Sequence, residues 1–177
     1  MATTTQITID SVDVSDPMTN GVESIYTISF TLEAGVPEDG YLFIDIPKTV
    51  IMNADNVRSS GSCALADTII CEEVIEDMFP GSEDTYGTIT IKTKEQFFAN
   101  VPYSLDFGGI TNPRNTERSE IFVINSFDND KIQQIGKGEG GNVKMTDLAP
   151  IDKFSGKNSD SRNGQSNTYA FAVDVNF

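Results

Sequence analysis

The chain has 177 residues, of which 27 are acidic, 12 are basic and none is histidine, so its net charge is −15. This length suits one complete domain plus a remainder, because two ordinary domains need more chain. The charge has the wrong sign for binding nucleic acid or an anionic membrane surface. No apolar run approaches the roughly 18 residues that a membrane-spanning helix needs.

Short bursts of alternating apolar and polar residues indicate β-strands from the start of the chain. In "QITIDSVDV", residues 6–14, the apolar phase shifts after Ser11, which predicts a β-bulge or a change of sheet. In "IYTISFTLE", residues 25–33, every second residue from Tyr26 to Leu32 is apolar. That strand should therefore have one inward and one outward face.

Seven later stretches also indicate strands: residues 41–47, 57–65, 68–73, 86–92, 103–110, 120–127 and 131–136. Only "CEEVIEDMF", residues 71–79, suggests a helix. Seven to nine short strands without a long helix predict an all-β fold. We expect an immunoglobulin-like, two-sheet antiparallel β-sandwich, and a barrel is the alternative.

The glycine-rich stretch "GKGEGG", residues 136–141, formally satisfies the dinucleotide-binding pattern G-x-G-x-x-G. That mechanism needs a helix N-terminus after the glycines to hold a pyrophosphate. The following residues, "NVKMTDLAP", show no helical period and end in Pro150. We therefore predict a loose turn or linker here.

The end of the chain repeats its beginning. At an offset of 143 positions, "RNGQSNTYAFAVDV", residues 162–175, aligns its Asn-Gly pair and its apolar phase with residues 19–32. At an offset of 142, Ile151-Asp152 repeats Ile9-Asp10. We predict a complete β-sandwich module over residues 1–149, with residues 150–177 supplying the first strands of a second module or a donated strand segment.

Five apolar positions of this last segment form a predicted assembly strand: Tyr169, Phe171, Val173, Val175 and Phe177. A lone two-stranded unit is at best marginally stable in water. The segment is therefore expected to pack on its own module or to pair with the sheet of a neighbouring chain by β-strand addition.

The two cysteines, Cys63 and Cys71, lie eight positions apart. If two strands fold back at Asp67, the cysteines face each other across the ladder at a separation that suits a disulfide. Closing so short a loop would contribute about 2.5 kcal/mol on the chain-entropy model. The chain lacks the four ligands of a zinc site and the histidine base of a thiol nucleophile.

The absence of histidine also removes the usual general base, so we expect no enzymatic activity and no catalytic residues. Calcium is the one ion whose ligands are plentiful, since it binds carboxylate and amide oxygens. The candidate ligands are Asp13, Asp16, Asp128, Asn129, Asp130, Asp147 and Asp152. Turn chemistry explains the same residues without an ion, and no other cofactor is expected.

Three stretches resemble a known kind of module: "ISFTLEAGVPEDGYLFIDIP" at residues 28–47, the two cysteines, and "FGGITNPRNTERSEIFVINSFDNDKI" at residues 107–132. They are similar to the tandem β-sandwich repeats of very large surface proteins in ciliates and similar protists. The resemblance spans most of residues 5–135 and rests on turn and strand signatures. It implies an extracellular, disulfide-bonded, repetitive structural protein.

The sequence therefore predicts a structural repeat unit of an extracellular filament or surface coat, which self-associates by head-to-tail module packing and β-strand pairing. Residues 1–91 hold 16 acidic and 2 basic residues, whereas residues 92–177 hold 11 and 10, an asymmetry that could orient a head-to-tail contact or attract divalent cations. A solvated acidic face is the simpler explanation. The alternative function is a calcium-dependent, adhesin-like module at the cell surface that binds a glycan or a protein partner.

Overall fold

The computed structural model describes residues 4–15, 18–64, 67–76, 85–114, 116–145, 151–158 and 169–175. The strands are β1 (Thr5–Val14), β2 (Glu23–Leu32), β3 (Tyr41–Pro47), β4 (Ile51–Met52), β5 (Ile69–Glu76), β6 (Thr85–Thr93), β7 (Pro102–Thr111), β8 (Phe122–Phe127), β9 (Gln134–Gly140), β10 (Ile151–Asn158) and β11 (Tyr169–Val175). Two short helices, α1 (Ala54–Arg58) and α2 (Gly61–Ala64), lie between β4 and β5 in the chain.

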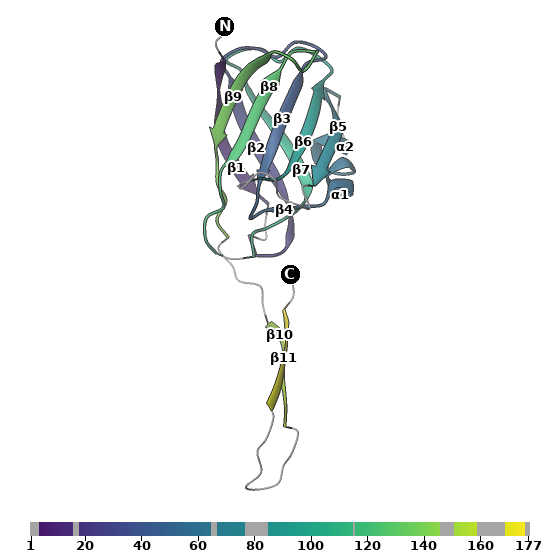
Figure 1. Ribbon diagram of the computed structural model, residues 1–177, viewed down its shortest axis with the longest axis vertical. Helices are drawn as coiled ribbons and strands as arrows, with labels where there is room; N and C mark the ends of the chain where they lie inside the picture. Colours follow the sequence, from purple (N-terminus) through teal and green to yellow (C-terminus); the bar gives the residue numbers. More distant parts are fainter. Residues whose placement is uncertain are drawn as a thin grey trace.

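Nine of these strands form one sheet in the order β4-β7-β2-β1-β9-β8-β3-β6-β5. Figure 1 shows this sheet curled on itself, with β9, β8, β3, β6 and β5 across the front and β1, β2 and β7 behind them. Strand β1 joins the two halves, because it pairs antiparallel with β2 and, through Thr5 and Gln6, parallel with β9. The register of β1 against β2 shifts between Ile9 and Ser11, which confirms the predicted bulge.

The prediction of an all-β fold is confirmed. Hydrogen bonding along β1 makes the nine strands one continuous sheet. The finer prediction of an immunoglobulin-like sandwich of two sheets is therefore not confirmed and stays a prediction. The predicted inward face of β2 is confirmed as well: Tyr26, Ile28, Phe30 and Leu32 are all fully buried. Burying side chains of this size stabilises the fold by about 1.5–3 kcal/mol each.

The glycine-rich stretch is a strand and not a turn, so that prediction was wrong. Strand β9 pairs antiparallel with β8 along most of its length and also contacts β1. A Cβ atom on Gly138 would collide with the backbone oxygen and the side chain of Ile7 on β1. The glycine is needed because only a residue without a side chain lets β1 approach this closely.

Two predictions between residues 54 and 79 were also wrong. Residues 57–58 and 61–64 are helical where a strand was predicted, and residues 71–76 lie in strand β5 where a helix was suggested for 71–79. Strand β5 confirms the strand predicted at 68–73, and residues 77–79 lie outside the described residues. Asn53 caps α1 by accepting a hydrogen bond from the backbone of Asn56. Pairing of β5 with β6 determines the second case, because tertiary contacts override the weak helical pattern of the local sequence.

Strands β10 and β11 form a separate two-stranded antiparallel sheet, which Figure 1 shows apart from the nine-stranded one. Its register shifts between Ile151 and Lys153, so Asp152 is the extra residue of a bulge, as Asp10 is in β1. The first hairpin pairs Ile9 with Phe30 and the second pairs Ile151 with Val175, a difference of two residues in the repeated numbering. A slip of two residues keeps every side chain on its original face.

Candidate functional site

The two ends of the curled sheet are β4, which pairs with β7, and β5, and a seam lies between β7 and β5. Helices α1 and α2 contact both of these strands and so fill the seam. A disulfide joins Cys63 on α2 to Cys71 on β5, with 5.3 Å between their Cα atoms. The predicted disulfide is confirmed, but it ties a helix to a strand and does not cross a two-stranded ladder.

Side chains from both helices form hydrogen bonds with backbone groups at the edges of β5 and β7. The Arg58 side chain donates a hydrogen bond of 2.9 Å to the backbone oxygen of Val74 on β5. The Ser62 hydroxyl accepts one of 2.9 Å from the backbone nitrogen of Asp106 on β7. Gly61 has a φ of 56°, and a Cβ there would overlap the Asp106 backbone, so this contact depends on glycine.

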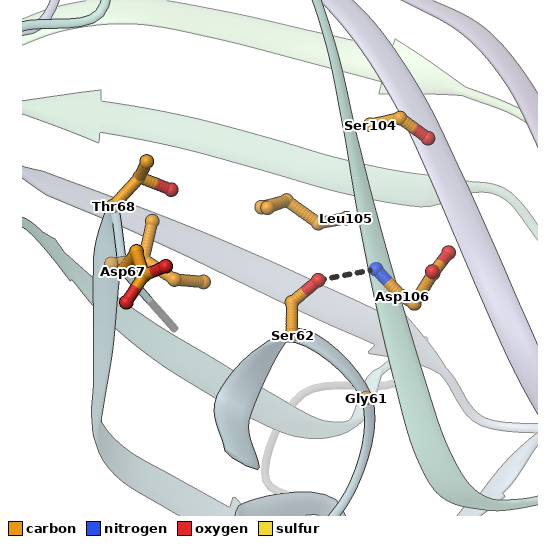
Figure 2. Close-up of a pocket in the computed structure, with 8 residues that line it drawn as sticks. Gly61, Ser62, Asp67, Thr68, Ser104, Leu105 and Asp106 are labelled. Carbon is orange, nitrogen blue, oxygen red and sulfur yellow. Dashed lines mark hydrogen bonds between the residues drawn. The ribbon is translucent and has the colours of Figure 1, made fainter. Parts of the chain in front are cut away.

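A cavity of about 320 Å³ lies beside this contact. Figure 2 shows Asp67 and Thr68 on one side of it, β7 on the other, and Ser62 bonded to Asp106 below. The remaining lining residues are Gly61, Ile69, Ser104 and Leu105. Ile69 and Leu105 are buried, so the cavity has an apolar floor and a polar rim.

Much of this polar rim already holds the structure together. The Asp106 carboxylate accepts a hydrogen bond of 2.7 Å from Thr27, and the Ser104 hydroxyl lies 3.2 Å from that of Ser29. With no histidine anywhere in the chain, the serine hydroxyls have no imidazole to act as their base. The cavity can present hydrogen-bond acceptors and hydroxyl groups to a small polar molecule.

The front half of the sheet consists of β9, β8, β3, β6 and β5 (Figure 1). Its outer face carries a row of aromatic rings on β3 and β8. The Phe43 and Phe127 rings meet edge to face with centroids 5.1 Å apart, and the Tyr41 ring lies 6.4 Å from that of Phe43. The Lys131 ammonium lies 4.1 Å from the Tyr41 centroid and 3.4 Å from the Glu72 carboxylate. Outward phase in "YLFIDIP" is the signal that could have identified these aromatic residues.

Next to these rings, polar side chains form a chain of hydrogen bonds across four strands. Asp45 accepts 2.7 Å and 3.4 Å bonds from Thr88 and Asn125, and Asn125 accepts one of 3.0 Å from Gln134. Burial raises the pKa of the Asp45 carboxyl above its ordinary value, although the Thr88 hydrogen bond and nearby Lys137 oppose that shift. This outer face is therefore ordered by its own contacts.

The outer face of the back half is different in chemistry, because it is built from hydroxyl and carboxylate groups. Thr31 donates to the Asp10 carboxylate at 2.8 Å, and Ser11 donates to Asp13 at 2.7 Å. The Thr31–Asp10 hydrogen bond joins the neighbouring strands β2 and β1, and the Ser11–Asp13 hydrogen bond lies within β1. The outer face of the curled sheet thus presents aromatic rings on its front half and carboxylate and hydroxyl groups on its back half.

The predicted calcium ligands do not converge in the part of the chain that the structure describes. No three acidic, cysteine or histidine side chains come together among those residues. The Asp128 carboxylate accepts hydrogen bonds from the backbone nitrogens of Asp130, Ile132 and Gln133, which is turn chemistry. Asn129 lies exposed in the same turn.

The other calcium candidates are spread along the chain. Asp13 lies on β1 and accepts the Ser11 hydroxyl, and Asp152 is the bulge residue of β10. Asp16 and Asp147 lie outside the described residues. Calcium binding therefore stays a prediction.

The predicted assembly strand is β11, except that Phe177 lies outside the described residues. Tyr169, Phe171 and Val173 pair with Asn158, Gly156 and Phe154 of β10. Where the apolar side chains of β11 pack is not part of the described structure, so its role in assembly stays a prediction. No helix among the described residues has the length and apolar character to cross a membrane.

No protein-family model and no curated protein sequence matches this chain. Among solved structures, a match is the crystal structure of BslA, described as a bacterial hydrophobin. It has 10% sequence identity and a TM-score of 0.47, and the match covers 82% of this chain and 98% of that one. Identity this low does not transfer a function.

Proposed function

We propose that this protein is a non-catalytic structural unit of an extracellular filament or surface coat, and that its copies associate through strand pairing at the β10–β11 hairpin. The observation that carries the proposal is the separate two-stranded sheet, whose strands pair with each other and with no other strand that the structure describes. Isolated hairpins are marginal in water, and added strands stabilise them.

The likeness between the two hairpins supports the proposal. Asp152 takes the bulge position in β10 that Asp10 takes in β1, at the offset found in the sequence. In the first hairpin, β1 and β2 each have a further neighbour, β9 and β7. By analogy, the hairpin would be completed by strand pairing with another copy of the chain, which would link immunoglobulin-like modules into an array.

The disulfide supports the extracellular location. Disulfides persist in oxidising compartments and are rare where glutathione and thioredoxin keep thiols reduced. The Cys63–Cys71 bond also holds the helix segment in the seam, so the module keeps its form outside the cell.

The test compares the full chain with a chain ended after Ala149, measured by light scattering and electron microscopy across protein concentration. The nine-stranded sheet is complete by Gly140, so the shortened chain should keep its melting temperature. We expect the full chain to self-associate and the shortened chain to stay monomeric. Equal self-association, or none in either chain, would contradict the proposal.

A second candidate is glycan binding at the aromatic row, because partly exposed rings beside hydrogen-bonding groups suit sugar recognition. Retention on glycan supports, lost in Phe43→Ala and unaffected in Ser29→Ala on the opposite face, would favour this function. Repeating the measurement with a calcium chelator separates a calcium-dependent adhesin from a calcium-independent one.

A further inference from the structure

At the ends of the two sheets, strands β4, β5, β10 and β11 each present an edge, and β7 presents the part of its edge that β4 leaves unpaired. The edges of β4, β7 and β5 are guarded. Strand β4 has only two residues, too few for a ladder. On strand β7, the backbone nitrogen of Asp106 already donates a hydrogen bond to the Ser62 hydroxyl. Strand β5 is covered by α1 and α2, receives the Arg58 side chain, and carries Glu72 and Glu73.

The last two edges belong to the hairpin, and they differ in composition. Strand β10, "IDKFSGKN", carries Lys153 and Lys157 and is interrupted by Gly156 and its bulge. Charged residues, glycine and bulges are the features that natural edge strands use to prevent pairing. Strand β11, "YAFAVDV", contains no glycine or proline, and Asp174 is its one charge. The edge of β11 is therefore the unguarded one.

We propose that two copies of this chain associate by antiparallel pairing of β11 with β11, which forms a four-stranded sheet in the order β10-β11-β11-β10. The partner is a second copy, because the composition of β11 complements itself in one register. With Ala172 on the two-fold axis, all seven residues of the strand have a partner.

In that register, aromatic residues lie opposite β-branched residues. Tyr169 faces Val175 of the second copy, and Phe171 faces Val173 of the second copy, pairs that stabilise antiparallel strands. Asp174 faces Ala170 of the second copy. A parallel, in-register arrangement would instead place Asp174 directly beside Asp174, and like charges at that distance destabilise pairing.

This inference rests on the proposed function, since it identifies the strand through which self-association occurs. A two-fold contact of this kind is self-complementary and closes into a dimer. A longer array would then be built from dimers, with a second and different contact between them.

Charge substitution tests which edge of the hairpin is used. In Ala172→Lys, two lysines would meet at the two-fold axis, and we expect the dissociation constant of the dimer to rise at least about tenfold. Ser155→Lys is the matched control, because Ser155 is paired with Ala172 within the hairpin but lies on β10. It should leave the dissociation constant within about twofold. Sedimentation velocity measures both.

Cysteine cross-linking tests the register, with oxidised glutathione as the oxidant. Ala172→Cys should give a covalent dimer, because facing residues bring their Cβ atoms close enough for a disulfide. Ala170→Cys should not, since it faces Asp174 of the second copy. Cross-linking of both variants would indicate a parallel pair and overturn the inference.

The outcomes separate this inference from the proposed function. If removal of residues 150–177 abolishes association while Ala172→Lys does not, the hairpin assembles the protein through another edge and only the inference fails. If Ser155→Lys weakens association and Ala172→Lys does not, β10 is the paired edge. If neither removal of the segment nor any substitution changes association, both proposals fail.

Discussion

The nine-stranded sheet and the hairpin differ in how they treat their strand edges. In the sheet, two short helices cover the edges of β5 and β7, and an arginine and a serine side chain form hydrogen bonds with the backbone of these strands. A disulfide joins one of the helices to β5. In the hairpin, one edge of β11 pairs with no other strand that the structure describes, and this strand carries a single charged residue. Edge protection is a local property of sequence, and one chain can protect one sheet while leaving another available for pairing.

The largest effect is expected from filling the space between β1 and β9. Gly138→Val would drive a side chain into Ile7 and should lower the free energy of unfolding by about 3 kcal/mol. Gly156→Val places the same side chain in β10 and should leave the main thermal transition unchanged. A similar loss in both variants would show that the two sheets fold as one unit and would remove the contrast between them.

Opening the disulfide should have the next largest effect. Replacing Cys63 and Cys71 together by serine removes a constraint on the unfolded chain and raises its conformational entropy. The free energy of unfolding, measured by urea denaturation, should fall by about 2.5 kcal/mol. The helices would then hold the seam by Arg58 and Ser62 alone, so new association through β5 or β7 is expected at high concentration. Association unchanged from the parent chain would mean that the helices guard the seam without the disulfide.

Removing a single guard should have a smaller effect. Arg58→Met keeps the length of the side chain but deletes its hydrogen bond to Val74, at a cost of about 1 kcal/mol in stability. It also removes a 3.3 Å ion pair with the exposed Asp55, which should contribute little. Arg118→Met is the control, because Arg118 is exposed and its hydrogen bond to Asn142 is long, at 3.5 Å. If both variants melt alike, the Arg58 contact contributes nothing to the seam.

The smallest effect is expected on the outer face, away from every edge. Burial raises the pKa of Asp45 in the folded state, so folding favours its protonated form. Stability from this group should therefore fall as the pH rises from its ordinary value of 3.8 through the raised folded value. Asp45→Asn should remove this dependence of stability on pH, which amounts to less than about 1 kcal/mol in the free energy of unfolding. It should not change association.

The strands and the inward face of β2 could be predicted from sequence because alternation reports directly which side of a strand is buried. The bulge at Asp10 was visible as a change of phase. The glycine-rich strand was not predictable, since its cause is the approach of Ile7 from the other end of the chain. The helix pair was hidden in the same way, because contacts with β5 and β7 stabilise a segment of weak local preference.

The candidate site followed the same rule. The cysteine pair could be found from spacing alone, whereas Arg58 and Ser62 act on backbone atoms of strands distant in sequence. The aromatic row could have been found from the outward phase of Tyr41 and Phe43. Calcium ligands were predicted from residue type, and that prediction is untested, although the Asp128 carboxylate accepts hydrogen bonds from backbone nitrogens of its own turn.

The parallel pairing of β1 with β9 has a consequence for how the module responds to stretching. Thr5 lies beside Gly136 and Gln6 beside Lys137, and both strands run in the same direction. Tension applied at residues before β1 and after β9 would therefore pull the two strands lengthwise past each other. Their hydrogen bonds would be loaded in shear and would have to break together rather than one after another, which is the geometry that resists extension best.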